Sequence, residues 1–253
     1  MDSVSIIFGL LIGGVITIAF WGAFIYGIIK VIKYTQQKEK ERKDNYQNGS
    51  YYAITHIPYE SRHNNKGTYG EYLVYDQLRH KESQGTKFLF NVYIPIENGQ
   101  TSEIDAIMLD KHGIFVFESK NYSGWIFGDE NSKQWCQCLK SGKRNSRKEY
   151  FYNPIKQNEG HINVLKFYLG YPHIPIHNIV VFSDRCSFKT KMNSNHVMHR
   201  HQLNGKIQAI SNSVAPCLTL EQIETIYQRL YPLTQMTTQI KTKHIEQIQS
   251  CKS

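Results

Sequence analysis

The feature that most constrains this chain is a pair of apolar segments, Ile104–Leu109 and Ile114–Phe117, with charged residues at their ends. They are joined by Asp110–Gly113, and strands rich in Ile, Val and Phe around a glycine-containing turn are typical of a β-hairpin. Because side chains alternate faces along a strand, Glu118 and Lys120 project from the same face. A core hairpin does not require such a charged pair, so a functional site is predicted at this strand end.

Asp105 extends the charged group, because it opens the first strand and pairing would bring its carboxylate near Glu118. Two carboxylates and an ammonium group suit a divalent metal and a phosphate. Mg²⁺ takes hard oxygen ligands, keeps several waters and binds through one or two carboxylates plus substrate phosphate. Lys120 could then orient or activate a water, or stabilise developing negative charge.

The chain begins with an uncharged segment, Val4–Ile29, which is longer than the ~20 residues that span a bilayer as a helix. Asp2 precedes it and basic residues follow from Lys30 onward, the reverse of the order in a signal peptide. The positive-inside bias places the downstream side in the cytoplasm. We therefore expect an uncleaved single-pass anchor at residues 1–33, in the lipid bilayer of the cell membrane, with the N-terminus outside and the C-terminal domain cytoplasmic.

Gly9 and Gly13 have the GxxxG spacing that lets two membrane helices approach, so a homodimer through them is one hypothesis. Glycine is also simply common in membrane helices. Residues 34–61 are polar and charged, and predict a basic juxtamembrane linker whose lysines favour anionic lipid. We assign residues 62–185 to the main folded domain and 186–253 to a C-terminal helical extension.

The segments before the hairpin predict a helix and a further strand. Phe88–Pro95 has the composition of a strand, and Asn98-Gly99 after it is a strong hairpin signal. A helix is predicted from Thr68 onward, with its apolar residues at helical spacing. The order of one helix and three strands predicts a mixed α/β core.

Glu71, on this first helix, has two interpretations. Thr68 and Glu71 have the spacing of a capping box, in which the glutamate satisfies a backbone group at the helix start. Alternatively, Glu71 lies on the inward face beside the charged strand ends. Spacing alone favours the cap.

A second helix is predicted to begin with Asn153 as N-cap and Pro154 at its first position, and to end at Gly170. Gln157 and His161 lead its otherwise apolar face. Taken alone, each is more typical of a satisfied buried polar group than of a catalytic one.

Several other segments suggest structure rather than chemistry. Ile179–Phe182 has the continuous apolar character of a buried central strand, and Thr219–Gln222 has the pattern of a capping box that opens a helix. The histidines between residues 196 and 201 have no carboxylate or cysteine at a suitable spacing, so no metal site is expected there. The five cysteines are scattered apart from Cys136-x-Cys138, and indicate ordinary thiols in a reducing compartment.

The charge balance is basic, with a formal net charge of +9 and a pI near 9.2. This fits a polyanionic partner or an anionic membrane surface. Part of it lies in a predicted loop, which is either solvated or a phosphate-tracking patch beside the site, because backbone charge dominates affinity for nucleic acid. The residues of this basic segment are Lys140, Lys143, Arg144, Arg147 and Lys148.

Taken in order, the motifs between residues 65 and 170 resemble the NERD (nuclease-related domain) family, a branch of the PD-(D/E)XK nuclease-like superfamily. The ordered series is more specific than any one piece. The family usually has a small apolar residue between the glutamate and the lysine, where this chain has Ser119. The matching residues are Gly70-Glu71, Asn91–Pro95, Glu103–Asp105, Gly113–Gly124, Trp135 and Asn153-Pro154-x-x-Gln157.

The resemblance implies a restriction-endonuclease-like mixed β-sheet core flanked by helices. It also implies that Asp105 and Glu118 bind Mg²⁺, with Mn²⁺ as a substitute, and that Lys120 positions the attacking water. Glu71 would assist as a further acidic group, which favours a site role over the cap, and Gln157 would line the site.

Two functional hypotheses follow. The first is a membrane-anchored, Mg²⁺-dependent nuclease at the cytoplasmic membrane face that hydrolyses phosphodiester bonds of nucleic acid, with DNA favoured over RNA. The alternative is a non-catalytic module on the same fold that binds nucleic acid or a protein. The intact set of Asp105, Glu118 and Lys120 favours the nuclease, because a binding module would not need it.

Overall fold

The computed structural model describes residues 3–141, 145–170, 173–189 and 195–235, except for the side chains of residues 3–19, 98, 141 and 145. The chain divides into two units, Met1–Asn48 and Gly49–Ser253. The first unit is described as one helix, α1 (Ser3–Gln47). It ends just before the Asn48-Gly49 pair.

The predicted membrane-spanning helix is not supported by the structure. Within the part of the chain that is described, no helix is long and apolar enough to cross a membrane. From residue 20 onward, where side chains are described, the uncharged stretch already ends at Ile29 and a lysine- and glutamate-rich part of α1 follows. Gly9 and Gly13, the predicted dimer contact, lie outside the described side chains.

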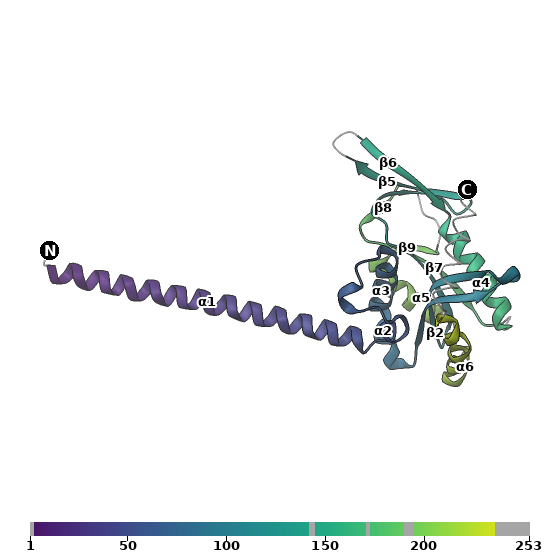
Figure 1. The fold of residues 1–253 in the computed structure, drawn as a ribbon, viewed down its shortest axis with the longest axis horizontal. Helices are drawn as coiled ribbons and strands as arrows, with labels where there is room; N and C mark the ends of the chain where they lie inside the picture. The colour runs from purple at the N-terminus through teal and green to yellow at the C-terminus, as the bar shows by residue number, and fades with distance from the viewer. Residues whose placement is uncertain (1–2, 142–144, 171–172, 190–194, 236–253) are drawn as a thin grey trace. The chain divides into compact units, whose positions relative to one another are not determined.

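The second unit is built on a five-stranded mixed sheet with the strand order β1-β2-β3-β7-β9 (Figure 1). The predicted hairpin forms its centre, since β2 pairs antiparallel with both β1 and β3. The predicted central strand is also confirmed, because β7 lies between β3 and β9 and is parallel to both. The strands are β1 (Lys87–Pro95), β2 (Thr101–Asp110), β3 (Gly113–Lys120), β7 (Ile176–Phe182) and β9 (Val197–His199).

Two helices, α3 (Lys66–Leu78) and α4 (Pro154–Leu169), flank the centre of this sheet. The backbone of α3 at Gly70 lies close to Ser119, whereas α4 meets Glu118 and Lys120. Neighbouring residues of a strand point to opposite faces, so α3 and α4 cover opposite faces of the sheet. The domain is therefore a mixed α/β fold with its sheet flanked by helices.

The start and end of α4 are as predicted. The Asn153 side chain accepts a hydrogen bond from the N–H of Ile155, Pro154 occupies the first turn, and Gly170 closes the helix with a φ of 69°. Asn153 is also fully buried, and its amide donates to the carbonyls of Asp129, Glu130 and Ser132. One side chain thus caps the helix and holds the preceding loop.

The remaining helices are short. They are α2 (Ser50–Thr55), α5 (Leu203–Ser213) and α6 (Leu220–Leu230), with 3-10 turns at Tyr59–Ser61, Arg79–Gln84, Glu97–Gly99, Arg200–Gln202 and Tyr231–Thr234. The capping box predicted at Thr219 and Gln222 is present at the start of α6.

A second sheet has the strand order β6-β5-β4-β8. The basic segment predicted as a loop lies largely on two paired strands of this sheet (Figure 1). Lys140 is on β5, and Arg147 and Lys148 are on β6, whereas Lys143 and Arg144 lie outside the described residues. The strands are β4 (Gly124–Phe127), β5 (Gln134–Ser141), β6 (Asn145–Tyr152) and β8 (Cys186–Phe188).

A shared core joins the two sheets. Ile126 and Trp135 from the second sheet pack with Val180 and Phe182 of β7 and with Ile155 of α4, all at most 3% exposed. Phe151 lies opposite Trp135 in the β5–β6 pairing and packs against the same cluster. The second sheet is therefore fixed to the strand that pairs with β3.

Candidate active site

The site forms where β2 and β3 part. Their pairing runs from Asp110–Gly113 to Ala106–Phe117, whereas β3 continues alongside β7 as far as Lys120. At Ser119 the backbone N–H donates instead to Oδ2 of Asp105, at 2.8 Å. The Asp105 carboxylate thus accepts a hydrogen bond that a backbone carbonyl of β2 would accept if the pairing continued. This hydrogen bond brings Asp105 to the Glu118–Lys120 segment.

Lys120 is held between two side chains. Its Nζ lies 2.6 Å from Oε1 of Glu118 and donates to Oε1 of Gln157 at 3.2 Å. The side chains of Glu118 and Lys120 are only 2% and 15% exposed. Gln157 thus reaches the site from α4 and helps to fix the direction of the ammonium group.

His161, one turn after Gln157, also faces Glu118. Its Nε2 lies 3.7 Å from Oε2 of Glu118, and its Nδ1 lies 2.8 Å from Oγ of Ser102. The sequence favoured a buried structural role for His161 and did not single out Ser102. Helical spacing from Gln157 was the available signal for His161, whereas Ser102 had none.

Glu71 lies within α3 rather than at its cap. The helix begins after Asn65, whose side chain accepts from the N–H groups of Gly67 and Thr68, so the predicted Thr68–Glu71 capping box is wrong. Glu71 is 7% exposed, and its Oε2 has no hydrogen-bond partner among the described residues.

The pKa shifts show how strongly these groups are coupled. Burial, and then the charges of Asp105 and nearby glutamates, raise the pKa of Glu71 well above its ordinary value. Burial, and then the charge of Glu118, raise the pKa of Asp105 to about 7, even though Lys120 opposes this. Burial lowers the pKa of Lys120, but the carboxylates of Glu118 and Asp105 outweigh it and raise the pKa above its usual range. The site therefore concentrates more negative charge than one lysine offsets.

These groups fit a hard divalent cation that is held partly by other ligands. Among the described residues, no three His, Cys, Asp or Glu side chains are grouped so that they could hold a metal ion. Asp105 and Glu118 supply two carboxylates, and Oε2 of Glu118 has no hydrogen-bond partner within that part of the chain. Mg²⁺ binds in this way, through one or two carboxylates with water and substrate phosphate at the other positions.

A local irregularity in β1 accompanies the site. Asn91 has a left-handed φ of 51°, and the β1–β2 register passes from Phe90–Ala106 to Val92–Ile104 without pairing Asn91 to Asp105. A non-glycine residue in this conformation costs energy and is often found at functional sites. The irregularity frees the backbone opposite Asp105, where β2 turns its carboxylate towards β3.

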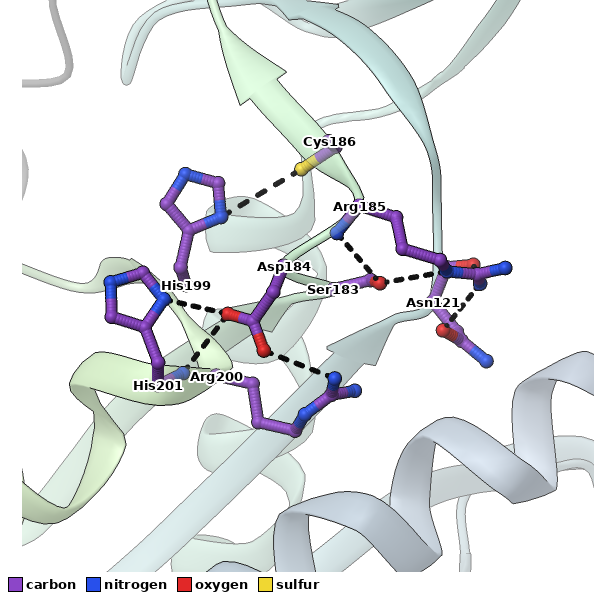
Figure 2. Close-up of polar contacts among 8 residues, drawn as sticks. All are labelled: Asn121, Ser183, Asp184, Arg185, Cys186, His199, Arg200 and His201. Atoms are coloured by element: carbon purple, nitrogen blue, oxygen red, sulfur yellow. Dashed lines mark hydrogen bonds and ion pairs between the residues drawn. The ribbon is translucent and has the colours of Figure 1, made fainter. Parts of the chain in front are cut away.

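A polar cluster after β7 supports the chain that leaves Lys120 (Figure 2). The guanidinium of Arg185 donates to both the backbone carbonyl and the side-chain oxygen of Asn121, at 3.1 and 2.8 Å, and Ser183 N–H donates to the Lys120 carbonyl. Asp184 beside it accepts from Arg200 and contacts the His201 ring. The segment after the strand end is thus tied to the segment after β7.

The three histidines between residues 196 and 201 each have their own polar contact, and the rings of His199 and His201 stack with their centres 5.6 Å apart. His196 Nδ1 lies 3.1 Å from the carbonyl of Asn178, His199 lies 4.0 Å from the sulfur of Cys186, and His201 bonds Asp184 (Figure 2).

The three basic residues of this segment that the structure describes do not all share one face of the second sheet. Arg147 and Lys148 are neighbours on β6 and so point to opposite faces of the sheet. Arg147 pairs with Glu149 at 2.8 Å on its own face. Lys140 lies opposite Ser146 and therefore shares the face of Lys148.

A cleft of about 460 Å³ between α4, β7 and α5 lies apart from this site. Its lining includes Lys166, His177, His196 and Lys206, and none of the acidic residues at the strand end. We therefore centre the site on Glu118 and Lys120 rather than on this cleft.

Comparisons with known proteins identify the family of this chain. A family model described as "Nuclease-related domain" (NERD) matches residues 66–183, which span α3 to the end of β7. An uncharacterized protein of Bacillus anthracis is 30% identical over 184 residues, which cover 72% of this chain and 82% of that protein. The chain belongs to the NERD family. No solved structure matches it. All the residues assigned above to the strand-end site lie inside the matched region, which supports a nuclease-like function.

Proposed function

We propose that this protein is a divalent-metal-dependent nuclease that hydrolyses phosphodiester bonds of nucleic acid, with DNA favoured. The observation that carries the proposal is the convergence of Asp105, Glu118 and Lys120 where β2 and β3 part. The buried Oε2 atoms of Glu118 and Glu71, which accept no hydrogen bond from the described residues, add to it. A purely structural strand end would leave these groups without compensation for their burial.

The proposed cofactor is Mg²⁺, with Mn²⁺ as a substitute, held by Asp105 and Glu118. When bound, such a cation polarises the scissile phosphate and lowers the pKa of a coordinated water. Glu71 adds a further acidic group from the other side of the sheet. His161 contacts Glu118 and is itself fixed by Ser102, so it orients the glutamate.

Lys120 would position the attacking water and stabilise negative charge on the phosphate. Its ammonium is already aimed by Glu118 and Gln157, and a preorganised cation of this kind does not have to reorient during reaction. Gln157 would keep the ammonium in place when Glu118 engages the metal.

Cleavage assays of the full chain test this proposal. We expect DNA cleavage that requires Mg²⁺ or Mn²⁺, stops with EDTA and is lost in Lys120→Ala. Lys156→Ala is the matched control, because Lys156 lies on α4 and its ammonium donates to the exposed loop carbonyl of Asn131. RNA substrates run in parallel determine the substrate class.

Two outcomes would refute catalysis at this site. Either the wild type is inert on all substrates with both metals, or Lys120→Ala cuts as fast as the wild type. An inert protein that still binds nucleic acid would support the alternative, a non-catalytic binding module on a nuclease-like fold.

We further propose, from the sequence alone, that residues 4–29 associate with the lipid bilayer of the cell membrane, with the folded domain in the cytoplasm and a homodimer contact at Gly9 and Gly13. Cysteine labelling of intact cells tests the orientation. A cysteine placed before residue 4 should label from outside, and Cys251 should not. The reverse pattern, or recovery of the full chain in the fraction free of membranes, would refute this placement.

A further inference from the structure

The outer face of the second sheet carries a group of exposed aromatic side chains. They are Trp125 and Phe127 on β4 and Tyr150 and Tyr152 on β6, with exposed fractions of 54%, 36%, 67% and 46%. The strand register places Phe127 opposite Cys136 and Cys136 opposite Tyr150, so the four rings share one face. We call this surface the aromatic face.

The arrangement of the aromatic face is that of two rows with a trough between them. β5 lies between β4 and β6 and presents Cys136 and Cys138 on this face, and both side chains are short. Neighbouring rings on one strand are ~7 Å apart, and the two rows are ~10 Å apart. Successive flat groups of an extended ligand can therefore meet separate rings.

The charge of the aromatic face is positive. Lys148 lies opposite Cys138 and Lys140 lies opposite Ser146, so both lysines share the face of the rings. Lys189, after β8, places its ammonium 5.0 Å from the ring centre of Trp125. The nearby acidic residue on β6, Glu149, points to the opposite face and pairs there with Arg147.

The aromatic face is rigidly supported from behind. Ile126, Trp135 and Phe151, which alternate with the exposed residues, pack in the core shared with β7. Rings fixed in advance lose little freedom when a ligand binds.

The aromatic face also continues directly from the active-site strand. Trp125 follows Lys120 by five residues, so the two backbone positions are at most ~18 Å apart. The connecting residues are fixed, since Arg185 bonds Asn121 (Figure 2) and Tyr122 packs against Phe151. A short, fixed segment therefore connects the aromatic face to the strand that carries Glu118 and Lys120.

We propose that the aromatic face binds single-stranded nucleic acid by stacking of its bases on Trp125, Phe127, Tyr150 and Tyr152, with Lys140, Lys148 and Lys189 contacting the phosphates. Exposed rings with interspersed cations are the combination that binds single strands, because every base offers a flat face to stack. A duplex buries those faces, so its affinity is lower. This inference deepens the proposed nuclease function, since it names the form of the nucleic acid, but it can be tested without cleavage.

Binding of the full chain to a labelled oligo(dT) in EDTA, followed by fluorescence anisotropy, tests the proposal. Trp125→Ala and Tyr150→Ala are each expected to weaken binding roughly 5- to 150-fold. Phe167→Ala, which removes a 92% exposed ring on α4, is the control and should change nothing. A matched duplex should bind more weakly than the single strand.

Salt dependence separates stacking from charge. Lys148→Ala should reduce the slope of log affinity against log salt by about 1, whereas Trp125→Ala should lower affinity and leave the slope unchanged. Unchanged oligo(dT) binding in Trp125→Ala and Tyr150→Ala would overturn the proposal, as would equal binding of duplex and single strand. It would also be overturned if these variants lost only binding to anionic lipid vesicles.

The two proposals fail separately. Loss of oligo(dT) binding in Trp125→Ala by a protein that never cleaves would refute the nuclease and leave the aromatic face established. Metal-dependent cleavage, together with wild-type oligo(dT) binding in both aromatic variants, would establish the nuclease and refute the role of the aromatic face.

Discussion

Replacing Gly70 by alanine should damage the protein at one defined contact. A Cβ atom at this position would lie 2.8 Å from Oγ of Ser119 and 2.9 Å from Cβ of Asn121. The Ser119 hydroxyl can rotate away, but a Cβ moves only with its backbone, and Asn121 is held by Arg185 and by its own bond to the Lys66 carbonyl. The helix α3 must therefore retreat from β3 by about 0.5 Å to restore ordinary contact.

The magnitude follows from two opposing effects. Overpacking of this kind costs ~1–3 kcal/mol, whereas alanine in place of glycine inside a helix returns ~0.5–1 kcal/mol. We expect Gly70→Ala to lower the free energy of unfolding by ~1 kcal/mol, within a range of ~0–2.5 kcal/mol. Glu71 follows Gly70 directly, so the same shift should lower metal-dependent cleavage by roughly 10-fold or more, since a 1 Å misplacement can cost ~100-fold.

Urea denaturation followed by circular dichroism measures the change in the free energy of unfolding. The cleavage rate with metal measures the effect on the site. Gly160→Ala on α4 is the matched control, because a Cβ there meets nothing within 4 Å and should be neutral or slightly stabilising. If Gly70→Ala unfolds at the same urea concentration as Gly160→Ala, α3 does not approach β3 closely enough for a Cβ at position 70 to clash, and the reasoning is refuted.

Three further predictions concern single residues. Asn153→Asp should lower the free energy of unfolding by about 3 kcal/mol in urea melts, because a carboxylate keeps the cap acceptor but replaces the amide that donates to three carbonyls. A cost near zero would show that the helix cap alone matters. Asp110 is partly desolvated, but hydrogen bonds from His112 and Thr86 outweigh the desolvation and lower the pKa of Asp110. The stability that Asp110 contributes is therefore present above its unfolded pKa of ~3.9 and is lost as the pH falls through its folded pKa. The stability gap between wild type and Asp110→Asn should therefore be largest near pH 7 and shrink below about pH 4, and a gap that widened on acidification would contradict the assignment. Gln157→Ala should reduce cleavage ~10-fold without changing the melting temperature, because Lys120 loses one of its two partners, and an unchanged rate would remove Gln157 from the site.

Local signals in the sequence predicted the framework well. The Asn153-Pro154 start and Gly170 end of α4 depend on backbone groups a few residues away, so the pattern alone identifies them. Alternation along β3 put Glu118 and Lys120 on one face, and the structure finds their side chains 2.6 Å apart. Such inferences need only the geometry of one strand or helix.

The remainder depended on contacts between distant segments. The Thr68–Glu71 capping pattern was real in the sequence, but Asn65 was available to start the helix three residues earlier. Likewise, no local pattern marks Ser102 as a partner of His161, since 59 residues separate them. The clustered charges of residues 140–148 suggested a loop. The described residues among them lie on strands instead, because Trp135 and Phe151 on the same two strands pack against β7, which the local sequence does not reveal.

The dependence of the cleavage rate on Mg²⁺ concentration, compared between wild type and Asp105→Asn, tests the central claim most directly. The wild type should show a rate that rises with Mg²⁺ and saturates. Asp105→Asn removes one of the two proposed carboxylate ligands, and its rate should be lower by ~100-fold or more and should need more metal. A wild-type rate that does not depend on Mg²⁺, or an Asp105→Asn curve that overlays it, would contradict a metal-dependent site at the end of β3.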